Sequence, residues 1–424
     1  MRKIKPSHYN IIVTNTQGKT TLYNSISKAY IEIDESLLDA DNLSMKKILE
    51  LDEVDDIQLL SKLGFLINED EDELEQIEYV YNKYYFNGTS LNIILTPTLA
   101  CNFKCPYCFE SGFESRWECK EDYFEVLKKY ADKYFSLYNS IEISLFGGEP
   151  LLCKEAIFSF LNYIEEKKLC KNLTISITTN GALIDNYVIN NLNKFHCRAI
   201  QITIDGTEEK HNLNRIFKDN TKTFRLLIEK IKLLVKELDI NTKIILRLNL
   251  KDVLPKEVKN TLEFFSREER KRISLLFRPI YQTNDYQEQN SSKLSDLNEY
   301  YKLGKNLGFS IVKNNYFYKT CEACGDDNFF YLMPDLSMWK CINDLSFNKA
   351  RIGKINEKGE IKINASNLMY WNKLANCFSN SKCRECKLLP DCYGGCILYY
   401  AKNKERLCKE FSMLSLPYLY EDEL

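Results

Sequence analysis

Three cysteines, Cys101, Cys105 and Cys108, follow an apolar run that begins at Leu91. Thiolates at this close spacing can hold three irons of a 4Fe–4S cube and leave the fourth iron without a protein ligand. An open iron can chelate a substrate or cofactor, which a site with four cysteine ligands cannot do. The spacing therefore predicts a cluster that takes part in chemistry.

A second group of cysteines lies toward the C-terminus. Eight thiols in ligand-like spacings are the complement of two fully ligated 4Fe–4S clusters, although Cys-x2-Cys pairs would serve two structural zinc sites as well. These are Cys321, Cys324, Cys341, Cys383, Cys386, Cys392, Cys396 and Cys408. The other five are scattered and are interpreted as ordinary thiols: Cys119, Cys153, Cys170, Cys197 and Cys377.

The composition indicates which partners and which cellular location to expect. The chain has 424 residues, a net charge of −2 and 16 cysteines. This charge gives no reason to expect nucleic acid or a membrane surface as partner, and no apolar stretch approaches a membrane span. The basic start is followed by an apolar run too short for a secretory signal, so we expect a cytoplasmic protein whose cysteines bind metal or clusters rather than form disulfides.

The middle of the chain alternates strands and helices. Six such units predict an α/β fold, with a parallel sheet curved into a partial (βα)6 barrel of the TIM type. The expected strands are 91–96, 141–146, 173–179, 199–205, 243–249 and 273–278, and the longer helices are 122–138, 154–168 and 224–238. Chemistry in such barrels gathers where the strands end. The unusual polar motifs all fall there: the cysteine triplet, Gly147-Gly148-Glu149-Pro150, 178–181 with Asn180, Asp205-Gly206, and Arg247 with Asn249.

We expect three domains, at 1–88, 89–315 and 316–424. The first begins with three short alternating runs at 10–13, 20–23 and 29–33, followed by helical patterns around Met45 and Leu60, the second of them ended by Gly64. The last is rich in cysteine and poor in long periodic segments, as in a small domain organised by metal.

The cysteine triplet, with Phe109 after its last member, resembles the signature of the radical S-adenosylmethionine (SAM) superfamily. The C-terminal cysteines resemble the SPASM domain, a carrier of two auxiliary clusters in peptide-modifying members. The first domain resembles the winged-helix module that binds leader peptides in enzymes maturing ribosomally made peptides (RiPPs). Such modules add the leader to a sheet edge, here 28–34, beside a helix at 46–51. A generic N-terminal cap is the alternative.

The resemblance implies roles for the residues at the strand ends. SAM would chelate the open iron through its amine and carboxylate, with Gly147 and Gly148 allowing close backbone approach to the amine. Glu149 would either fix that turn or bind SAM directly. Thr203, Asn180 and Arg247 would contact SAM, with Arg247 the preferred partner of a carboxylate. Asp205 would either orient SAM or face the substrate. The ring of Tyr107 or Phe109 would cover the adenine side. Without the family, His211 and Arg215 would be solvated helix positions.

The resemblance also implies a pairing of the C-terminal ligands. One auxiliary cluster would use Cys321, Cys324, Cys341 and Cys396, and the other Cys383, Cys386, Cys392 and Cys408. Two departures are visible: Leu336 stands where the family usually has glycine, and Ile342 follows Cys341 where sulfatase-maturing relatives have Asp, with Asp344 two residues on. The second departure argues against sulfatase maturation.

By this resemblance the protein is an oxidoreductase that generates a 5′-deoxyadenosyl radical from SAM, with a ferredoxin or flavodoxin as electron donor. The radical would abstract hydrogen from a cysteine-containing precursor peptide, so that an oxidative cross-link forms, with a cysteine thioether as the first choice. The alternatives are C–C cross-linking, epimerisation, sulfatase-type maturation, or a non-catalytic iron–sulfur or zinc scaffold that binds peptide. Epimerisation would need a spare cysteine lining the cavity.

Overall fold

The computed structural model describes residues 3–14, 20–39, 42–48, 54–86, 88–108, 110, 122–251, 253–279, 297–312, 325–406 and 408. Its centre is an 11-stranded sheet with the strand order β14-β13-β12-β11-β10-β9-β8-β15-β16-β17-β18. Neighbouring strands from β14 to β15 run parallel, and those from β15 to β18 run antiparallel. The parallel part carries the predicted functional loops.

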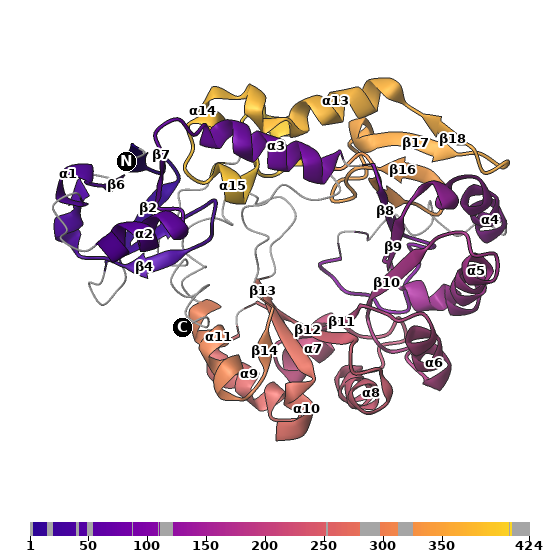
Figure 1. Cartoon of the computed structure of the whole chain (residues 1–424). Coiled ribbons are helices and arrows are strands. Elements are labelled where there is room, and N and C mark those ends of the chain that lie inside the picture. Colours follow the sequence, from indigo (N-terminus) through magenta and orange to yellow (C-terminus); the bar gives the residue numbers. More distant parts are fainter. Residues whose placement is uncertain are drawn as a thin grey trace.

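Six parallel strands form the predicted partial barrel, which the structure confirms. They are β8 (Ser90–Leu95), β9 (Ser140–Leu145), β10 (Asn172–Thr179), β11 (Ala199–Asp205), β12 (Lys243–Leu250) and β13 (Ile273–Pro279), each within one residue of the expected bounds. The helices α4 (Tyr123–Tyr134), α5 (Lys154–Glu166), α6 (Asn186–Lys194), α7 (Glu208–Asn214), α8 (Phe224–Glu237), α9 (Pro255–Leu262) and α10 (Arg267–Lys271) follow them. These helices lie outside the curve of the strands (Figure 1).

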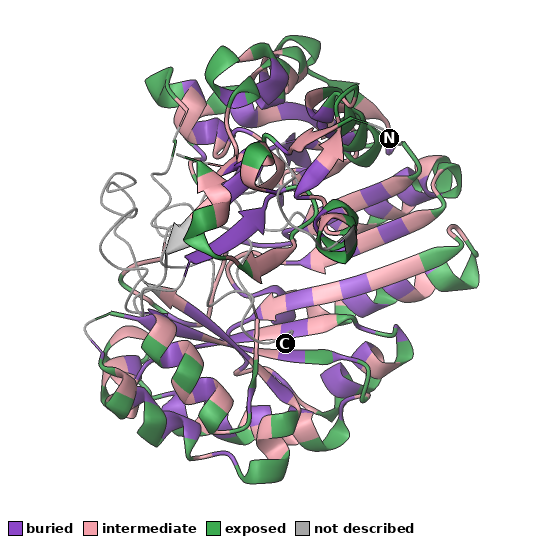
Figure 2. Cartoon of the chain, turned by 60° about the vertical axis from the view of Figure 1, so that its left-hand side comes forward, coloured by how far each residue is buried: buried purple, intermediate pink, exposed green. Residues whose placement is uncertain are grey.

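Burial alternates along the barrel strands, as the banding in Figure 2 shows. In β9, Ile141, Ile143 and Leu145 are buried and belong to the same hydrophobic cluster as residues of the outer helices. Their neighbours Glu142 and Ser144 are only partly buried, on the opposite face. The concave face of β9 therefore carries polar side chains, which suit a polar ligand better than a packed interior would.

The sheet extends beyond the barrel at both edges. At one edge, β14 (Ser310–Ile311) follows α11 (Leu297–Asn306) and pairs with β13. At the other, β15 (Phe329–Leu332) pairs in parallel with β8, and β16 (Ser337–Trp339), β17 (Arg351–Ile355) and β18 (Ile361–Ile363) continue the sheet. One sheet thus joins the barrel to the cysteine-rich segment.

The other elements in the described part of that segment are short helices. They are η5 (Asn348–Ala350), α13 (Ala365–Ala375), η6 (Cys377–Ser379), α14 (Ser381–Arg384), α15 (Leu389–Cys392) and α16 (Ile397–Asn403). Two further short 3-10 helices lie in the barrel, η2 (Phe135–Leu137) and η3 (Pro150–Cys153).

The N-terminal module, the described residues before 88, contains the three expected strands. They form an antiparallel sheet in the order β2 (Asn10–Thr14), β3 (Thr20–Asn24), β4 (Tyr30–Glu32), so that β4 lies at one end. Helices α1 (Met45–Ile48) and α2 (Val54–Lys62) follow, and Gly64 ends α2 in a left-handed conformation. Smaller elements complete the module: η1 (Glu35–Leu37), and the pairs β5 (Leu38–Asp39) with β6 (Asn42–Leu43) and β1 (Ile4–Pro6) with β7 (Leu66–Asn68).

Helix α3 (Glu73–Tyr85) was not predicted from the sequence. Asp72 caps its N-terminus by accepting a hydrogen bond from the Glu75 N–H, and acidic residues stabilise that end of a helix. Its buried residues Ile77, Tyr81 and Tyr85 share a hydrophobic cluster with residues of the cysteine-rich segment, among them Phe378. Helix α3 therefore joins the N-terminal module to the C-terminal part of the chain.

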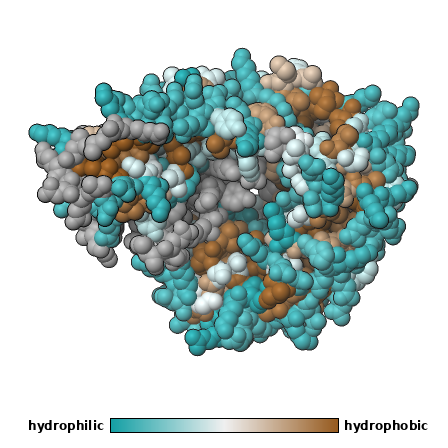
Figure 3. Space-filling view, viewed as in Figure 1, coloured by the Kyte–Doolittle hydropathy of each residue, from teal (hydrophilic) through white to brown (hydrophobic). Residues whose placement is uncertain are grey.

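Hydrophilic residues cover much of the face shown in Figure 3, with hydrophobic patches between them. In the part of the chain that the structure describes, no helix is both long and apolar enough to cross a membrane.

Candidate functional site

The predicted three-cysteine loop follows β8. Cys101, Cys105 and Cys108 are all partly buried and none is in a disulfide, whereas Phe109 lies outside the described residues. The Cys101 sulfur accepts a hydrogen bond from the Phe103 N–H at 3.4 Å. Burial raises the pKa of the Cys101 thiol to about 12, against the opposing effect of that N–H. Such a thiol keeps its proton until a metal displaces it.

The loop is held in place by the segment after α7. Phe103 and Phe217 form an antiparallel bridge, and the Lys104 N–H donates to the Ile216 carbonyl at 3.0 Å. The loop is therefore anchored through its backbone.

Gly147 and Gly148 pack against the chain just before Cys101. A Cβ on Gly148 would lie 2.4 Å from the carbonyl oxygens of both Leu99 and Ala100, and Gly147 has a φ of +125°. The Gly148 N–H donates to the Thr98 carbonyl at 3.1 Å. In this structure, glycine is required at both positions so that the end of β9 can approach the cysteine loop.

Glu149 holds the turn at the end of β9, which is one of the two roles expected for it. Its carboxylate is fully buried and accepts hydrogen bonds from the Leu151 N–H, the Thr179 hydroxyl and the Asn180 N–H, at 3.0, 2.7 and 2.7 Å. Burial raises its pKa, and these bonds oppose that rise. Glu149 thus ties the end of β9 to the end of β10.

Asn180 continues this chain of contacts to the cysteine loop. Its side-chain amide donates to the Asn102 Oδ1 at 2.6 Å and lies 3.7 Å from the Cys101 sulfur. Amide donors to a ligating sulfur are one of the protein's means of tuning a cluster. The ends of β8, β9 and β10 are therefore one connected unit.

Tyr107 connects the same loop to the opposite side of the barrel. Its hydroxyl donates to the Asp205 carboxylate, with distances of 2.8 and 2.7 Å to the two oxygens. The Asn249 amide donates to Asp205 at 3.1 Å, and Arg247 donates to the Asn249 Oδ1 at 2.9 Å. Burial raises the pKa of Asp205, while the charge of Arg215 opposes it.

Thr203 and Arg247 lie opposite each other in the pairing of β11 with β12. Thr203 is buried, and burial together with the charges of Arg278 and Arg215 lowers the pKa of Arg247 to about 10. Several guanidinium groups thus share this end of the barrel, which favours an anionic ligand there.

The family-independent interpretation of His211 and Arg215 as solvated positions is wrong. His211 is fully buried, where its Nδ1 accepts the Asp205 N–H at 3.2 Å and its Nε2 lies 3.0 Å from the Thr223 hydroxyl. Arg215 donates to the Tyr107 hydroxyl at 3.2 Å. His211, Arg215 and Asn102 are site neighbours that were not among the predicted SAM contacts. The available signals were closeness in sequence to the Asp205-Gly206 turn for the first two, and to Cys101 for Asn102.

Two buried donors beside the loop lack a partner: the Asn102 amide nitrogen and the Arg215 Nε. Sulfur and carboxylate acceptors brought by a cluster and its ligand would suit both, so the residues fit such a group. Among the described residues, no group of three or more His, Cys, Asp or Glu is arranged to hold a single metal ion. A cube binds each thiolate through a different iron, so it needs the sulfurs farther apart than one ion does.

The described C-terminal cysteines fall into two places. Cys341 and Cys396 belong to a hydrophobic cluster that also contains Leu99, two residues before Cys101. Cys321 and Cys324 lie outside the described residues.

The other place holds Cys383, Cys386, Cys392 and Cys408. Burial raises the pKa of the first three thiols, and that of Cys392 reaches about 12. The nearby Cys408 raises the pKa of all three as well. Arg406 lowers the pKa of Cys383, and its buried Nε has no partner. A thiolate-bound cluster would supply an acceptor for that donor, so this group also fits.

The turn at Leu336 has a backbone conformation that glycine adopts most readily. Leu336 has a φ of +66°, in the left-handed region, and its side chain is buried at 4% exposure. Asp344 is paired with Lys402 and caps the Ser346 N–H at 2.9 Å.

Comparison with known proteins agrees with the fold. Residues 95–265 match the Radical SAM superfamily model. The structure of native anSMEcpe with bound AdoMet superposes with a TM-score of 0.57 at 20% identity, covering 78% of this chain and 96% of that one. Streptococcus suis SuiB bound to precursor peptide SuiA gives 0.53 at 18%, covering 98% and 100%.

The first curated relatives align with a smaller part of this chain than the solved structures do. An uncharacterised protein of Methanocaldococcus jannaschii is 30% identical over 117 residues, 28% of this chain and 39% of the relative. The chain spans less than half the length of the first curated relatives that it matches. A cysteine-type anaerobic sulfatase-maturating enzyme of Clostridium novyi is 23% identical over 74% of this chain and 89% of its own. The central segment thus matches the radical SAM superfamily in sequence and resembles its solved structures in fold.

Proposed function

We propose that this protein is a radical SAM peptide maturase that installs an oxidative cross-link, a cysteine thioether, in a ribosomally made precursor peptide. The observation that carries the proposal is the connected unit at the strand ends. There the Cys101 loop contacts Asn180 on one side and, through Tyr107, Asp205 on the other. When bound, a 4Fe–4S cluster with SAM supplies the electron transfer that yields a 5′-deoxyadenosyl radical.

The proposed ligands of this cluster are Cys101, Cys105 and Cys108. The polar residues around them would bind and orient SAM, with Arg247 holding its carboxylate. A carboxylate would offset both the burial and the neighbouring positive charges that lower the pKa of Arg247. Asn180, Thr203 and Asp205 would contact the remainder. Gly147, Gly148 and Glu149 would act by shaping the turn that supports the loop.

Two auxiliary 4Fe–4S clusters complete the proposal. The mutual influence of Cys383, Cys386, Cys392 and Cys408 supports their assignment to one cluster. The shared hydrophobic cluster of Cys341 and Cys396 supports their assignment, with Cys321 and Cys324, to the other. A ferredoxin or flavodoxin would deliver electrons.

The N-terminal module would bind the leader of the precursor along β4. Its support is the position of β4 at the end of a three-stranded antiparallel sheet, with α1 in the same module. A leader added as a further strand would gain main-chain hydrogen bonds. The described part of the expected helix wall is Met45–Ile48.

Two solved structures favour a peptide substrate, since SuiB was solved with its precursor peptide SuiA and anSMEcpe with the Kp18Cys peptide. Epimerisation is less favoured, because the four described thiols outside the proposed ligand sets, Cys153, Cys170, Cys197 and Cys377, pack into hydrophobic clusters. Cys119 lies outside the described residues. Sulfatase maturation is less favoured, because Asp344 is engaged with Lys402.

Anaerobic reconstitution followed by 5′-deoxyadenosine analysis tests the proposal. Wild-type protein should bind iron and sulfide for three cubes and release 5′-deoxyadenosine with dithionite. Replacing Cys101, Cys105 and Cys108 by alanine should remove about a third of the iron and abolish SAM cleavage. The C170A variant is the matched control. Cleavage by the triple variant would overturn the cluster assignment.

The cross-link has its own test. Co-expression with a cysteine-containing precursor peptide should give a product that is lighter by two hydrogens per bond in intact-mass spectra. Alkylation should then find one free thiol fewer per bond. Mass loss without thiol loss would point to the C–C alternative.

A further inference from the structure

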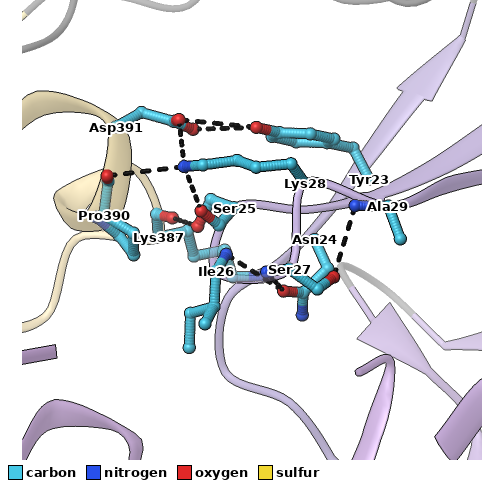
Figure 4. Close-up of polar contacts among 10 residues, drawn as sticks. All are labelled: Tyr23, Asn24, Ser25, Ile26, Ser27, Lys28, Ala29, Lys387, Pro390 and Asp391. Atoms are coloured by element: carbon cyan, nitrogen blue, oxygen red, sulfur yellow. Dashed lines mark hydrogen bonds and ion pairs between the residues drawn. The ribbon is translucent and has the colours of Figure 1, made fainter. Parts of the chain in front are cut away.

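The turn between β3 and β4 contacts the loop between Cys386 and Cys392 (Figure 4). Lys28 forms an ion pair with Asp391 and donates to the Pro390 carbonyl at 3.4 Å. The Tyr23 hydroxyl donates to the same Asp391 carboxylate at 3.1 Å, and the Ser25 hydroxyl donates to the Lys387 carbonyl. Two segments more than 350 residues apart in sequence thus meet side by side.

The turn that presents Lys28 is held in one conformation. The Asn24 Oδ1 accepts the N–H groups of Ile26 and Ser27 at 3.0 and 2.9 Å, and its amide donates to the Gly64 carbonyl at 3.0 Å. Lys28 itself has a left-handed φ of 63°, which is unusual for a residue other than glycine. The position of the Lys28 ammonium group is therefore determined by a network and not by chance extension of a surface side chain.

Apolar contacts flank the ion pair. Leu388 packs with Ile11 and Tyr23 of the N-terminal module. Cys383 and Leu389 lie in the hydrophobic cluster that contains Tyr9. The side chain of Asp391 is only 17% exposed, so the pair is less screened by water than a pair on the open surface.

We propose that Lys28 is a positioning residue of the second auxiliary-cluster site, acting from the N-terminal module through Asp391. This rests on the proposed function, since it takes Cys383, Cys386, Cys392 and Cys408 as the ligands of that cluster. Asp391 directly precedes Cys392 in sequence and Lys387 directly follows Cys386. The β3–β4 turn therefore fixes the loop between two ligands and sets the charge beside the cluster.

The charges of Lys28 and Asp391 should affect how easily the proposed auxiliary cluster is reduced. Reduction adds an electron to the cluster, and negative charge nearby opposes it. Lys28 neutralises Asp391. Removing Lys28 leaves the carboxylate uncompensated and should lower the midpoint potential, whereas removing the carboxylate should raise it. Removing both should bring the potential back toward the wild-type value.

The contact also couples leader binding to the cluster. Strand β4 begins at Tyr30, two residues after Lys28, so a peptide bound along β4 would act on the same turn. If such a peptide changes the midpoint potential of the cluster, then reduction of the cluster must change the affinity for the peptide by an equal free energy. A tenfold difference in affinity between the two redox states corresponds to 59 mV.

The test is a redox titration of the full-length reconstituted protein, followed by electron paramagnetic resonance. The variants are K28M, D391N, the double variant K28M/D391N, and K28R, which keeps the charge. The matched control is K3M, which removes the same charge at a different place. Lys3 pairs with Glu69 at 3.9 Å within the N-terminal module.

One auxiliary signal should shift to lower potential in K28M and to higher potential in D391N, with K28R, K3M and the double variant near the wild type. Equal potentials in K28M and K3M, with full iron content, would overturn the role of Lys28 and leave the proposed function intact. Iron for only one cube in the wild type would overturn both.

Discussion

Tyr107, which lies between two of the three proposed cluster ligands, donates its hydroxyl hydrogen to Asp205 at the end of β11, 2.7 Å away. The two residues are 98 positions apart in sequence, and their bond connects the cysteine loop to the far side of the barrel opening. The loop's orientation is therefore coupled to strands β11 and β12 as well as to β8.

The Y107F variant should be measurably less stable. It removes a donor to a buried carboxylate, which costs about 1–3 kcal/mol. The measurement is the free energy of unfolding in urea, together with SAM affinity after reconstitution, which should fall. The matched control is Y163F, because Tyr163 donates to Asp132 at 2.7 Å on the exposed surface and should change stability by less than about 0.5 kcal/mol. Equal losses in both variants would contradict the coupling.

The E149Q variant should weaken the turn that supports the loop. One of the two Glu149 oxygens becomes an amide nitrogen. That nitrogen cannot accept the backbone N–H bond that the oxygen now receives, at a cost of about 1–3 kcal/mol. Thermal unfolding and iron retention by the loop are the measurements. E142Q is the control, because Glu142 is 26% exposed and pairs with Arg198 on the concave face. A stable E149Q protein with normal iron would rule out this role.

Stability should depend on pH through His211. Burial lowers the pKa of His211 from 6.5 to about 3, so the folded protein keeps this imidazole neutral while the unfolded chain takes up a proton below pH 6.5. The stabilisation is complete above pH 6.5 and is lost as the pH falls toward 3, at about 1.4 kcal/mol per pH unit. Between pH 6.5 and 5, the wild type should therefore lose about 2 kcal/mol that the H211Q variant does not lose.

Urea unfolding at several pH values measures this difference. The H8Q variant, which removes an exposed imidazole, is the matched control. Parallel profiles for the wild type and H211Q would exclude His211 as the source.

At Leu336, the glycine variant should be more stable than the alanine variant, the reverse of the usual order in a strand. Both L336A and L336G lose a buried side chain and should be less stable than the wild type. Because Leu336 has a left-handed φ of 66°, glycine should be more stable than alanine there by about 1 kcal/mol. At Leu332, buried in the neighbouring strand β15, alanine should be the more stable of the two. Alanine ahead of glycine at Leu336 would contradict the observed turn.

The barrel strands were predictable because their signal is local. Each has a short apolar run bounded by turn residues, and the expected and observed bounds differ by at most one residue, as at Ser90–Leu95. Helix α3 was missed because its first turn lies in an acidic stretch, and its apolar residues Ile77, Tyr81 and Tyr85 become informative only when Phe378 packs against them.

The amino-acid sequence alone determined which residues could form clusters, because the spacing of Cys101, Cys105 and Cys108 within one loop is a property of the chain itself. Only the tertiary structure decided that Glu149 supports a turn, that His211 is buried, that Arg215 contacts Tyr107, and that Lys28 reaches Asp391. Each of these depends on contacts between segments far apart in sequence. Local patterns carry no record of such contacts, because burial and charge pairing arise only when the chain has folded.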